Sequence, residues 1–268
     1  MLRAREVRSI SANLLEAMRF FGRARQNGQV VEHPGVCQIF CGLNYAAFNA
    51  AVMTGPMVTE PSELRRRIEA PARLFQARNL RWTYWFCDDD LDVTLQREAR
   101  TLFRLFGLTP LTEPPGLYAD QLLAPRRPLP QIDVRPVVDD ATRQAFAYIT
   151  SVGFEIPQLV CRDIYSSEHA WTGAFPGVFQ GYVGYAGGLP VCTTATVISH
   201  DLVGIYSVAT APNSRRQGYA EAIMRQVLRQ ARERTGIEAT ALQSTEAGFR
   251  LYERMGYRKL TSFSVYIS

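Results

Sequence analysis

The sequence of 268 residues has few of the residues that build metal centres or disulfide frameworks. It contains three histidines and five cysteines, and none of them falls in H-x-H, H-E-x-x-H or C-x-x-C spacing. Such spacings are typical of zinc sites, so the sequence predicts no bound metal. The odd number of cysteines, most of them among apolar neighbours, indicates buried free thiols and a reducing, cytoplasmic location.

Long apolar runs and long basic runs are missing as well. No apolar stretch approaches the roughly 20 residues of a membrane-spanning helix, and the N-terminus lacks the apolar core of a secretory signal. The formal net charge is +5, but no run of Lys and Arg exceeds three residues. Residues 206–259 carry ten Lys or Arg against five Asp or Glu. This local excess favours a compact polyanionic ligand, with neither a nucleic acid nor a membrane as partner, and leaves the oligomeric state open.

Prolines mark the division of the chain. Four of them stand within residues 122–136, and this density is typical of an extended linker because each proline restricts its own backbone and that of its predecessor. The sequence therefore predicts two domains, with hydrophobic content of 47% that suits globular folding. The predicted boundaries are 1–125 for the first domain, 126–130 for the linker and 131–268 for the second domain.

The second domain reads as a mixed α/β fold. Stretches with alternating or β-branched residues predict strands, and apolar residues at helical spacing predict helices. Asp139 or Asp140 is expected to cap the first of these helices. The expected strands are 132–137, 177–186, 190–199, 202–210, 238–243 and 257–267, and the expected helices are 139–152, 157–169, 216–234 and 246–255.

The end of the first domain resembles the end of the second. A strand is expected at 81–87 and a helix at 93–106, followed by Gly107. The segment LFRLFGL (102–108) places a glycine five residues after a leucine, as LYERMGY (251–257) does 149 residues later. This weak repeat indicates a duplicated fold.

The stretch GIYSVATAPNSRRQGYAEAIMRQVLR (204–229) carries the clearest chemical signal. It predicts a strand, a short polar loop and a helix whose start contains Gly218 and Ala220. Small residues there allow a phosphate group to approach the free amides of a helix N-terminus. A P-loop is excluded because no Lys-Ser/Thr follows the glycine, and the G-x-G-x-x-G of dinucleotide folds is absent from this stretch.

Two motifs in this domain point to one family. Arg215, Gly218 and Ala220 satisfy [RQ]-x-x-G-x-[GA], and GFRLYERMGY (248–257) follows A-x-x-L-Y-E-x-x-G-[FY] with Gly248 at the alanine position. In this order and separation they resemble the GNAT acetyltransferase superfamily over about residues 131–268. The resemblance implies an α/β fold with a mixed sheet and acetyl-CoA as co-substrate. It also implies acetyl transfer to a primary amine of a small molecule or peptide.

The resemblance implies roles for individual residues. Tyr252 matches the tyrosine that protonates the departing thiolate, and Glu155 lies where the superfamily builds its acceptor pocket, as base or amine anchor. Thr245 stands where the family often has asparagine, and Thr240 where some members have a glutamate base. The implied acetyl-CoA contacts are the strand beside the pantetheine arm, the turn around the pyrophosphate and the asparagine position: Val208, Ala209, Thr210, Arg215, Arg216, Gln217, Gly218, Tyr219, Ala220, Glu221 and Thr245.

Each of these residues also has a purely structural interpretation. Gly218 would allow close helix–sheet packing, Tyr252 would pack at a helix face, and Glu155 would end a helix. Trp171 and Tyr206 would either line the acceptor site or belong to the core.

The predicted activity is direct acyl transfer, in which the amine attacks the thioester without a covalent enzyme intermediate. A non-catalytic CoA-binding or scaffold module is the alternative, because Thr240 and Thr245 depart from the family pattern. Shifting the pyrophosphate motif back by 149 residues reaches RRIEAP (66–71) in an expected helix, with no matching glycine. The first domain is therefore interpreted as a degenerate copy that does not bind CoA and instead walls the acceptor cleft.

Overall fold

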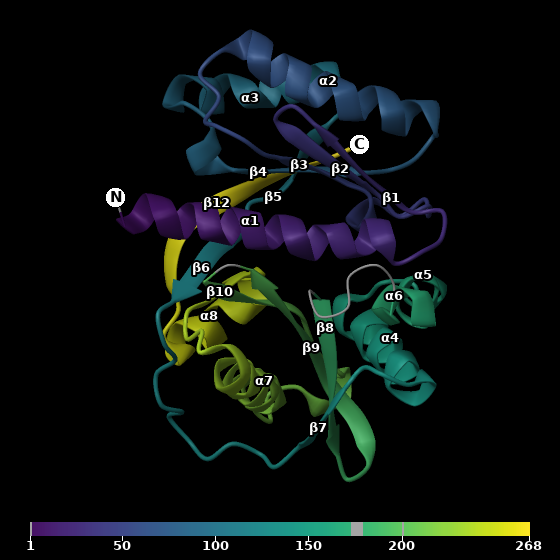
Figure 1. Ribbon diagram of the computed structural model, residues 1–268, viewed down its shortest axis with the longest axis vertical. Coiled ribbons are helices and arrows are strands. Elements are labelled where there is room, and N and C mark those ends of the chain that lie inside the picture. Colours follow the sequence, from purple (N-terminus) through teal and green to yellow (C-terminus); the bar gives the residue numbers. More distant parts are fainter. Residues whose placement is uncertain (1, 173–178, 200) are drawn as a thin grey trace.

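The computed structural model describes residues 2–172, 179–199 and 201–268, and the first half of it begins with one long helix (Figure 1). This helix, α1, buries residues such as Ile10, Leu14 and Met18, which recur at helical spacing along one face. The elements of this half are α1 (Leu2–Arg23), β1 (Gln29–His33), β2 (Val36–Phe40), η1 (Ala46–Phe48), β3 (Ala50–Met53), α2 (Pro61–Ala77), β4 (Thr83–Cys87), η2 (Asp88–Asp90), α3 (Val93–Leu105), β5 (Thr109–Thr112) and β6 (Pro115–Ala119).

The second half follows the predicted order of strands and helices, which confirms the fold class. The first two residues of the strand predicted at 177–186 lie outside the described residues. His200 also lies outside them. The elements are β7 (Asp133–Pro136), α4 (Asp140–Phe154), α5 (Gln158–Tyr165), α6 (Glu168–Thr172), β8 (Phe179–Ala186), β9 (Leu189–Ser199), β10 (Leu202–Thr210), η3 (Pro212–Ser214), α7 (Tyr219–Thr235), β11 (Thr240–Gln243), α8 (Glu246–Met255) and β12 (Arg258–Ile267).

Two predicted helices differ from the structure. The helix predicted over 157–169 is divided into α5 and α6. The helix predicted to begin at Arg216 begins three residues later, because Arg216 (φ 63°) and Gly218 (φ 92°) adopt left-handed backbone conformations that a right-handed helix excludes. The predicted cap at Asp139 is confirmed, since its side chain and that of Thr142 form a reciprocal capping box.

All strands join one sheet in the order β1-β2-β3-β4-β12-β6-β11-β10-β9-β8-β7, with β5 paired to β12. Helices α2 and α3 pack on the same face as α7 and α8, and the opposite face is covered by α1, α4 and α5. α1 lies across both halves of the sheet (Figure 1). Asn13, which is 1% exposed, fixes it there by donating to Val197 O and the Ser199 hydroxyl, and by accepting from the Tyr206 hydroxyl.

The two halves repeat the same arrangement and exchange strands to complete it. Each half contains two parallel, paired strands that are connected by a helix. β3 and β4 are connected through α2, and β10 and β11 are connected through α7. The strand next to β11 is β6 from the first half, followed by the beginning of β12. The strand next to β4 is the end of β12, followed by β5. The predicted duplication is thus visible in the fold. The domain boundaries around the linker at 126–130 stay a prediction, because each half needs a strand from the other to complete its part of the sheet.

Other features of the described residues bear on the sequence interpretation. All five cysteines are buried and free, as predicted. Among the described residues, no cluster of three or more His, Cys, Asp or Glu side chains is arranged to hold a metal ion. None of the described helices combines the length and apolar character that crossing a membrane requires.

The shared strand predicts that the two halves unfold together. Phe263 in β12 is 2% exposed and packs in one core with residues of α1, β2, β6 and β10. We expect Phe263→Ala to lower the free energy of unfolding by about 3–5 kcal/mol. Hydrogen exchange should show earlier opening of β4 and β11 at the same denaturant concentration.

The exposed Tyr148 on α4 provides a control for this experiment. Tyr148→Ala should change the free energy of unfolding by less than about 0.5 kcal/mol. If Phe263→Ala opened β4 but left the exchange of β11 unchanged, the two halves would be independent units.

Candidate functional site

Strands β10 and β11 diverge and leave a gap in the middle of the sheet. They pair in parallel at only two positions, Val203 with Thr240 and Gly204 with Ala241. β10 continues to Thr210, and the strand on the other side of β11 is the exchanged β6. Among the described strands, residues 205–210 pair with β9 alone, so the backbone edge from 205 to 209 is open to an extended ligand.

A β-bulge lies on β10 at this gap. The register with β9 shifts between Tyr206 and Ala209, and Ser207 has a positive φ of 50°. Hydroxyls of β9 hold the bulge, since Thr193 Oγ1 donates to Ser207 O over 3.0 Å. A bulge redirects the backbone at the point where a strand passes a site. Val208 and Thr210, two of the predicted acetyl-CoA contacts, are half-buried here, whereas Ala209 is buried.

The turn before α7 presents a row of free backbone amides. Within the part of the chain that the structure describes, no hydrogen bond is donated by the amides of residues 216–221, and Ala222 N is the first to bond, to Gly218 O. The positive φ of Gly218 closes this turn without a side chain over the amides. Free amides and the positive end of the helix dipole suit an anion such as pyrophosphate.

The proline-rich linker contributes a cation that the sequence analysis missed. A Cβ atom on Gly218 would lie 3.1 Å from Pro130 Cδ and 3.6 Å from Arg127 Nη2. The exposed Arg127 guanidinium is thus beside the free amides. The excess of prolines in this segment suggested only a spacer, and no local pattern links residue 127 to residue 218.

Several of the predicted ligand contacts are engaged within the protein. Arg215 Nη2 donates to Gly153 O over 3.2 Å and Nε donates to Thr210 O over 3.4 Å, so this arginine joins the end of α4 to β10. Glu221 forms an ion pair with Arg225 one turn further along α7. Gln217 Nε2 donates to Asn213 O. Arg216 remains exposed at the turn.

Tyr252 lies under the gap. Its residue is 7% exposed, and its ring packs edge-to-face on Tyr257 with 5.9 Å between ring centroids. Val208 of β10 and Tyr219 of α7 pack against the same apolar cluster, so the structure brings these predicted residues together. Burial raises the pKa of Tyr252 to about 12. The phenol therefore keeps its proton at neutral pH, as a proton donor must.

Gly248 makes room for the Tyr252 ring. A Cβ atom at Gly248 would lie 2.7 Å from Cε2 and 3.3 Å from the hydroxyl of Tyr252. The glycine at this motif position thus leaves room for the ring in the orientation it adopts here. Thr240, at the position of a family base, is fully buried and shares a hydrogen bond of 3.0 Å with the Tyr257 hydroxyl.

Glu155 lies at the end of α4 on the other face of the sheet. It is the C-cap residue with φ 57°, and its side chain is exposed. The close approach of α4 to β10, where a Cβ on Gly153 would be 2.6 Å from Ala209 Cβ, brings this helix end to the bulge.

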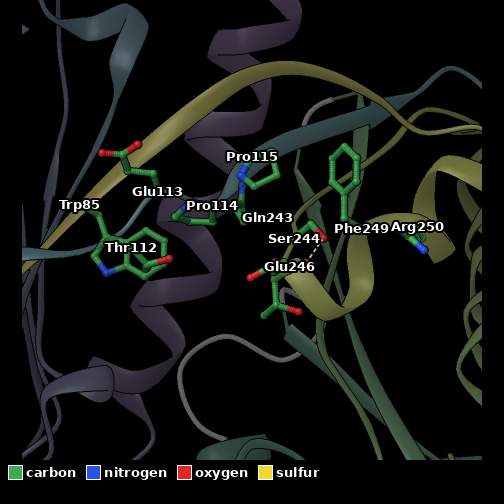
Figure 2. Close-up of a pocket in the computed structure, with 11 residues that line it drawn as sticks. Trp85, Thr112, Glu113, Pro114, Pro115, Gln243, Ser244, Glu246, Phe249 and Arg250 are labelled. Carbon is green, nitrogen blue, oxygen red and sulfur yellow. Dashed lines mark hydrogen bonds between the residues drawn. The ribbon is translucent and has the colours of Figure 1, made fainter.

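Thr245 borders a large hollow between the two halves. Its hydroxyl accepts from Gly248 N and caps α8. The hollow, of about 660 Å³, has Trp85 and Glu113 on one side and Ser244 and Glu246 on the other (Figure 2). The structure thus places Thr245 at a cleft wall, where its contact with a ligand stays a prediction.

In the first half, the turn between β3 and α2 corresponds to the turn before α7. The guanidinium of Arg67 occupies this turn. Arg67, 4% exposed, donates from Nη1 to Thr54 O over 2.7 Å and to Pro56 O over 3.3 Å. Val58 N is bonded to Asp90 O. Carbonyls around a buried guanidinium are unsuited to an anion, whereas the turn before α7 offers amides.

The comparison with protein families gives a match in the second half of the chain. A model of the "Acetyltransferase (GNAT) family" matches residues 141–257, which hold the diverging strands, the amide turn and Tyr252. Residues 141–257 belong to the GNAT acetyltransferase family. A comparison with curated protein sequences gave no match.

Solved structures similar to the whole chain share the GNAT fold. A GCN5-related N-acetyltransferase from Kribbella flavida is 18% identical with a TM-score of 0.69, over 96% of this chain and 95% of that one. One from Sphaerobacter thermophilus is 16% identical with a TM-score of 0.58, over 87% and 76%. A tandem GNAT protein from the clavulanic acid biosynthesis pathway is 13% identical with a TM-score of 0.53, over 91% and 80%. The GNAT domain at 141–257 is therefore part of a larger shared fold.

The contact between Gly248 and Tyr252 predicts a measurable coupling. Gly248→Ala should lower the free energy of unfolding by about 1–3 kcal/mol, because the added methyl group meets the buried ring. In a Tyr252→Leu background, which lacks the ring atoms concerned, this cost should disappear. Denaturant unfolding of the four proteins measures the coupling, and additive effects would contradict the packing role of Gly248.

Proposed function

We propose that the chain is an acetyl-CoA-dependent N-acetyltransferase that transfers the acetyl group to a primary amine by direct attack. One observation carries the proposal: within the GNAT-family segment, the free amides at 216–221 begin α7, while the buried Tyr252 shares an apolar cluster with Val208 of β10 and Tyr219 of α7. Such an arrangement suits a long ligand with a phosphate end and a reactive end.

The chain's own groups account for binding of the co-substrate. The amides of residues 216–221 would hold the pyrophosphate, with Arg127 and Arg216 as nearby cations. The free edge of Val208–Thr210 would pair with the amide groups of the pantetheine arm. The GNAT family uses acetyl-CoA as co-substrate, and here it would supply the activated acetyl group.

Tyr252 would then act as the general acid. When the amine nitrogen bonds to the carbonyl carbon, the C–S bond breaks and the sulfur takes the phenolic proton. The backbone at the bulge would polarise the carbonyl, and Glu155 would anchor the ammonium or accept its proton at the α4 side. The peptide or small-molecule nature of the amine follows the family, and the next subsection narrows its class.

The amide turn can be tested with a charge at Gly218. Gly218→Glu should reduce CoA affinity by at least about 100-fold, because the side chain covers the amides and its charge repels the pyrophosphate. Isothermal titration calorimetry with CoA measures this. Gly236→Glu is the matched control: it lies at the other end of α7, also has a positive φ (73°), and has no atom within 4 Å of an added Cβ. Equal affinity of both variants would exclude the turn as the binding site.

The role of Tyr252 can be tested by kinetics. Tyr252→Phe should lower kcat about 100-fold with little change in KM, because the phenol acts in the transition state. Tyr257→Phe, which removes a neighbouring buried hydroxyl, should change kcat less than about threefold. With its pKa raised to about 12, Tyr252 should cause no loss of kcat up to about pH 10.

Two outcomes would contradict these roles. An unchanged kcat in a folded Tyr252→Phe protein would assign the proton transfer to water or another hydroxyl. CoA binding without thiol release for any amine tested would instead indicate a binding module.

A further inference from the structure

An apolar cavity lies beside the β10 bulge, on the face of the sheet opposite α7 and α8. Its volume is about 180 Å³, and both halves of the chain form its walls. The first half contributes Phe48 and one face of α1, including Ala17 and Phe21. The second half contributes the end of α4, part of α5 and the bulge residue Ser207. The cavity therefore exists only because α1 crosses both halves.

The lining indicates an uncharged occupant. None of the twelve described residues around the cavity carries a charge, and eight of them are Phe, Tyr, Leu or Met. An ionised group in such surroundings would lose hydration without gaining a partner. An apolar cavity of about 150 Å³ is large enough for one benzene molecule. The volume thus matches a single ring or a branched alkyl group.

One polar atom in the wall lacks a partner. Thr150 is 2% exposed, and its hydroxyl makes no hydrogen bond to any described residue. By contrast, the Tyr206 hydroxyl in the same wall donates to Asn13 Oδ1 over 2.8 Å. A buried hydroxyl without a partner is unfavourable by about 1–3 kcal/mol. This oxygen is also inaccessible to water, so the part of Thr150 that lines the cavity is apolar.

The cavity is adjacent to the proposed reaction centre. Ser207 is next to Val208, on the strand segment proposed to hold the thioester. Phe154 and Ile156 line the cavity, and the residue between them is the exposed Glu155. A ligand can thus bury an apolar group in the cavity and keep an ammonium group at its edge, near Glu155 and the bulge.

We propose that this cavity binds the side group of the acceptor, and that the acceptor is a primary amine bearing an uncharged, phenyl-sized apolar group. The inference rests on the proposed acetyltransferase activity for its reaction, and on the cavity alone for its ligand class. The first half, whose equivalent turn surrounds Arg67 with carbonyls, thereby helps select the acceptor through Ala17, Phe21 and Phe48.

Turnover of four amines tests the ligand class. Thiol release with saturating acetyl-CoA should give kcat/KM at least about 100-fold higher for tyramine and 2-phenylethylamine than for agmatine and β-alanine, whose side groups are charged. Ala17→Leu, which fills the cavity from α1, should lower kcat/KM for the aromatic amines at least tenfold.

Direct binding separates the cavity from the reaction. Benzyl alcohol should bind the unmodified protein in calorimetry and fail to bind Ala17→Leu, whether or not any amine is acetylated. If benzyl alcohol binds in this way but no thiol is released, the cavity proposal stands and the acetyltransferase proposal fails. If agmatine or β-alanine is acetylated as well as the aromatic amines and Ala17→Leu has no effect, the cavity proposal is wrong and the activity stands. Absence of both benzyl alcohol binding and aromatic preference would also overturn the cavity proposal.

Discussion

The exchange of β6 and β12 between the two halves is the constraint on which the rest of the structure depends. β12 pairs with β6 through its first residues and with β4 and β5 through its last ones, so one strand belongs to both halves. Its inward side chains, such as Phe263, pack against α1, which itself spans both halves. Backbone pairing of this kind must form completely or leave buried polar groups unpaired. The exchange therefore joins a duplicated fold into a single 12-stranded sheet.

The gap between β10 and β11 becomes possible within this rigid frame. Only two residue pairs hold these parallel strands together, but each strand is paired on its other side, β10 with β9 and β11 with β6. The frame therefore tolerates an open edge that would otherwise close or associate with another chain. The bulge at Ser207 and the turn at Gly218 lie along this edge, and Tyr252 packs beneath it. A preorganised gap keeps proposed binding and proton-donating groups in place before a ligand arrives.

The two halves have diverged at equivalent positions. The turn before α7 has free amides and a nearby linker arginine, whereas the turn before α2 surrounds the buried Arg67 with carbonyls. The buried Arg67 thus gives the first-half turn a different polarity from the turn before α7. In the first half, α1 and Phe48 form part of the cavity beside the bulge. The duplication thus pairs one half that carries the family motifs with one half that shapes the neighbouring surface.

The sequence alone determined the local features of the second half. Alternation and helical spacing are properties of neighbouring residues, so the strands and helices, the cap at Asp139 and the family motifs at Arg215–Ala220 and Tyr252 were predictable from them. The start of α7 was misplaced because a positive φ at Arg216 depends on the fold around it. The repeat at Gly107 and Gly256 indicated duplication but carried no information on strand pairing.

Only the tertiary structure decided which strands exchange and which distant groups meet. The pairing of β12 with β4, the approach of Arg127 to Gly218 and the assembly of the cavity from α1 and α4 join residues more than 85 positions apart. No periodicity links such residues, because their contact results from packing the whole sheet. The hydroxyl of Thr150 illustrates the limit: in the sequence it is one threonine in an amphipathic helix, and only its burial beside a cavity leaves it without a partner.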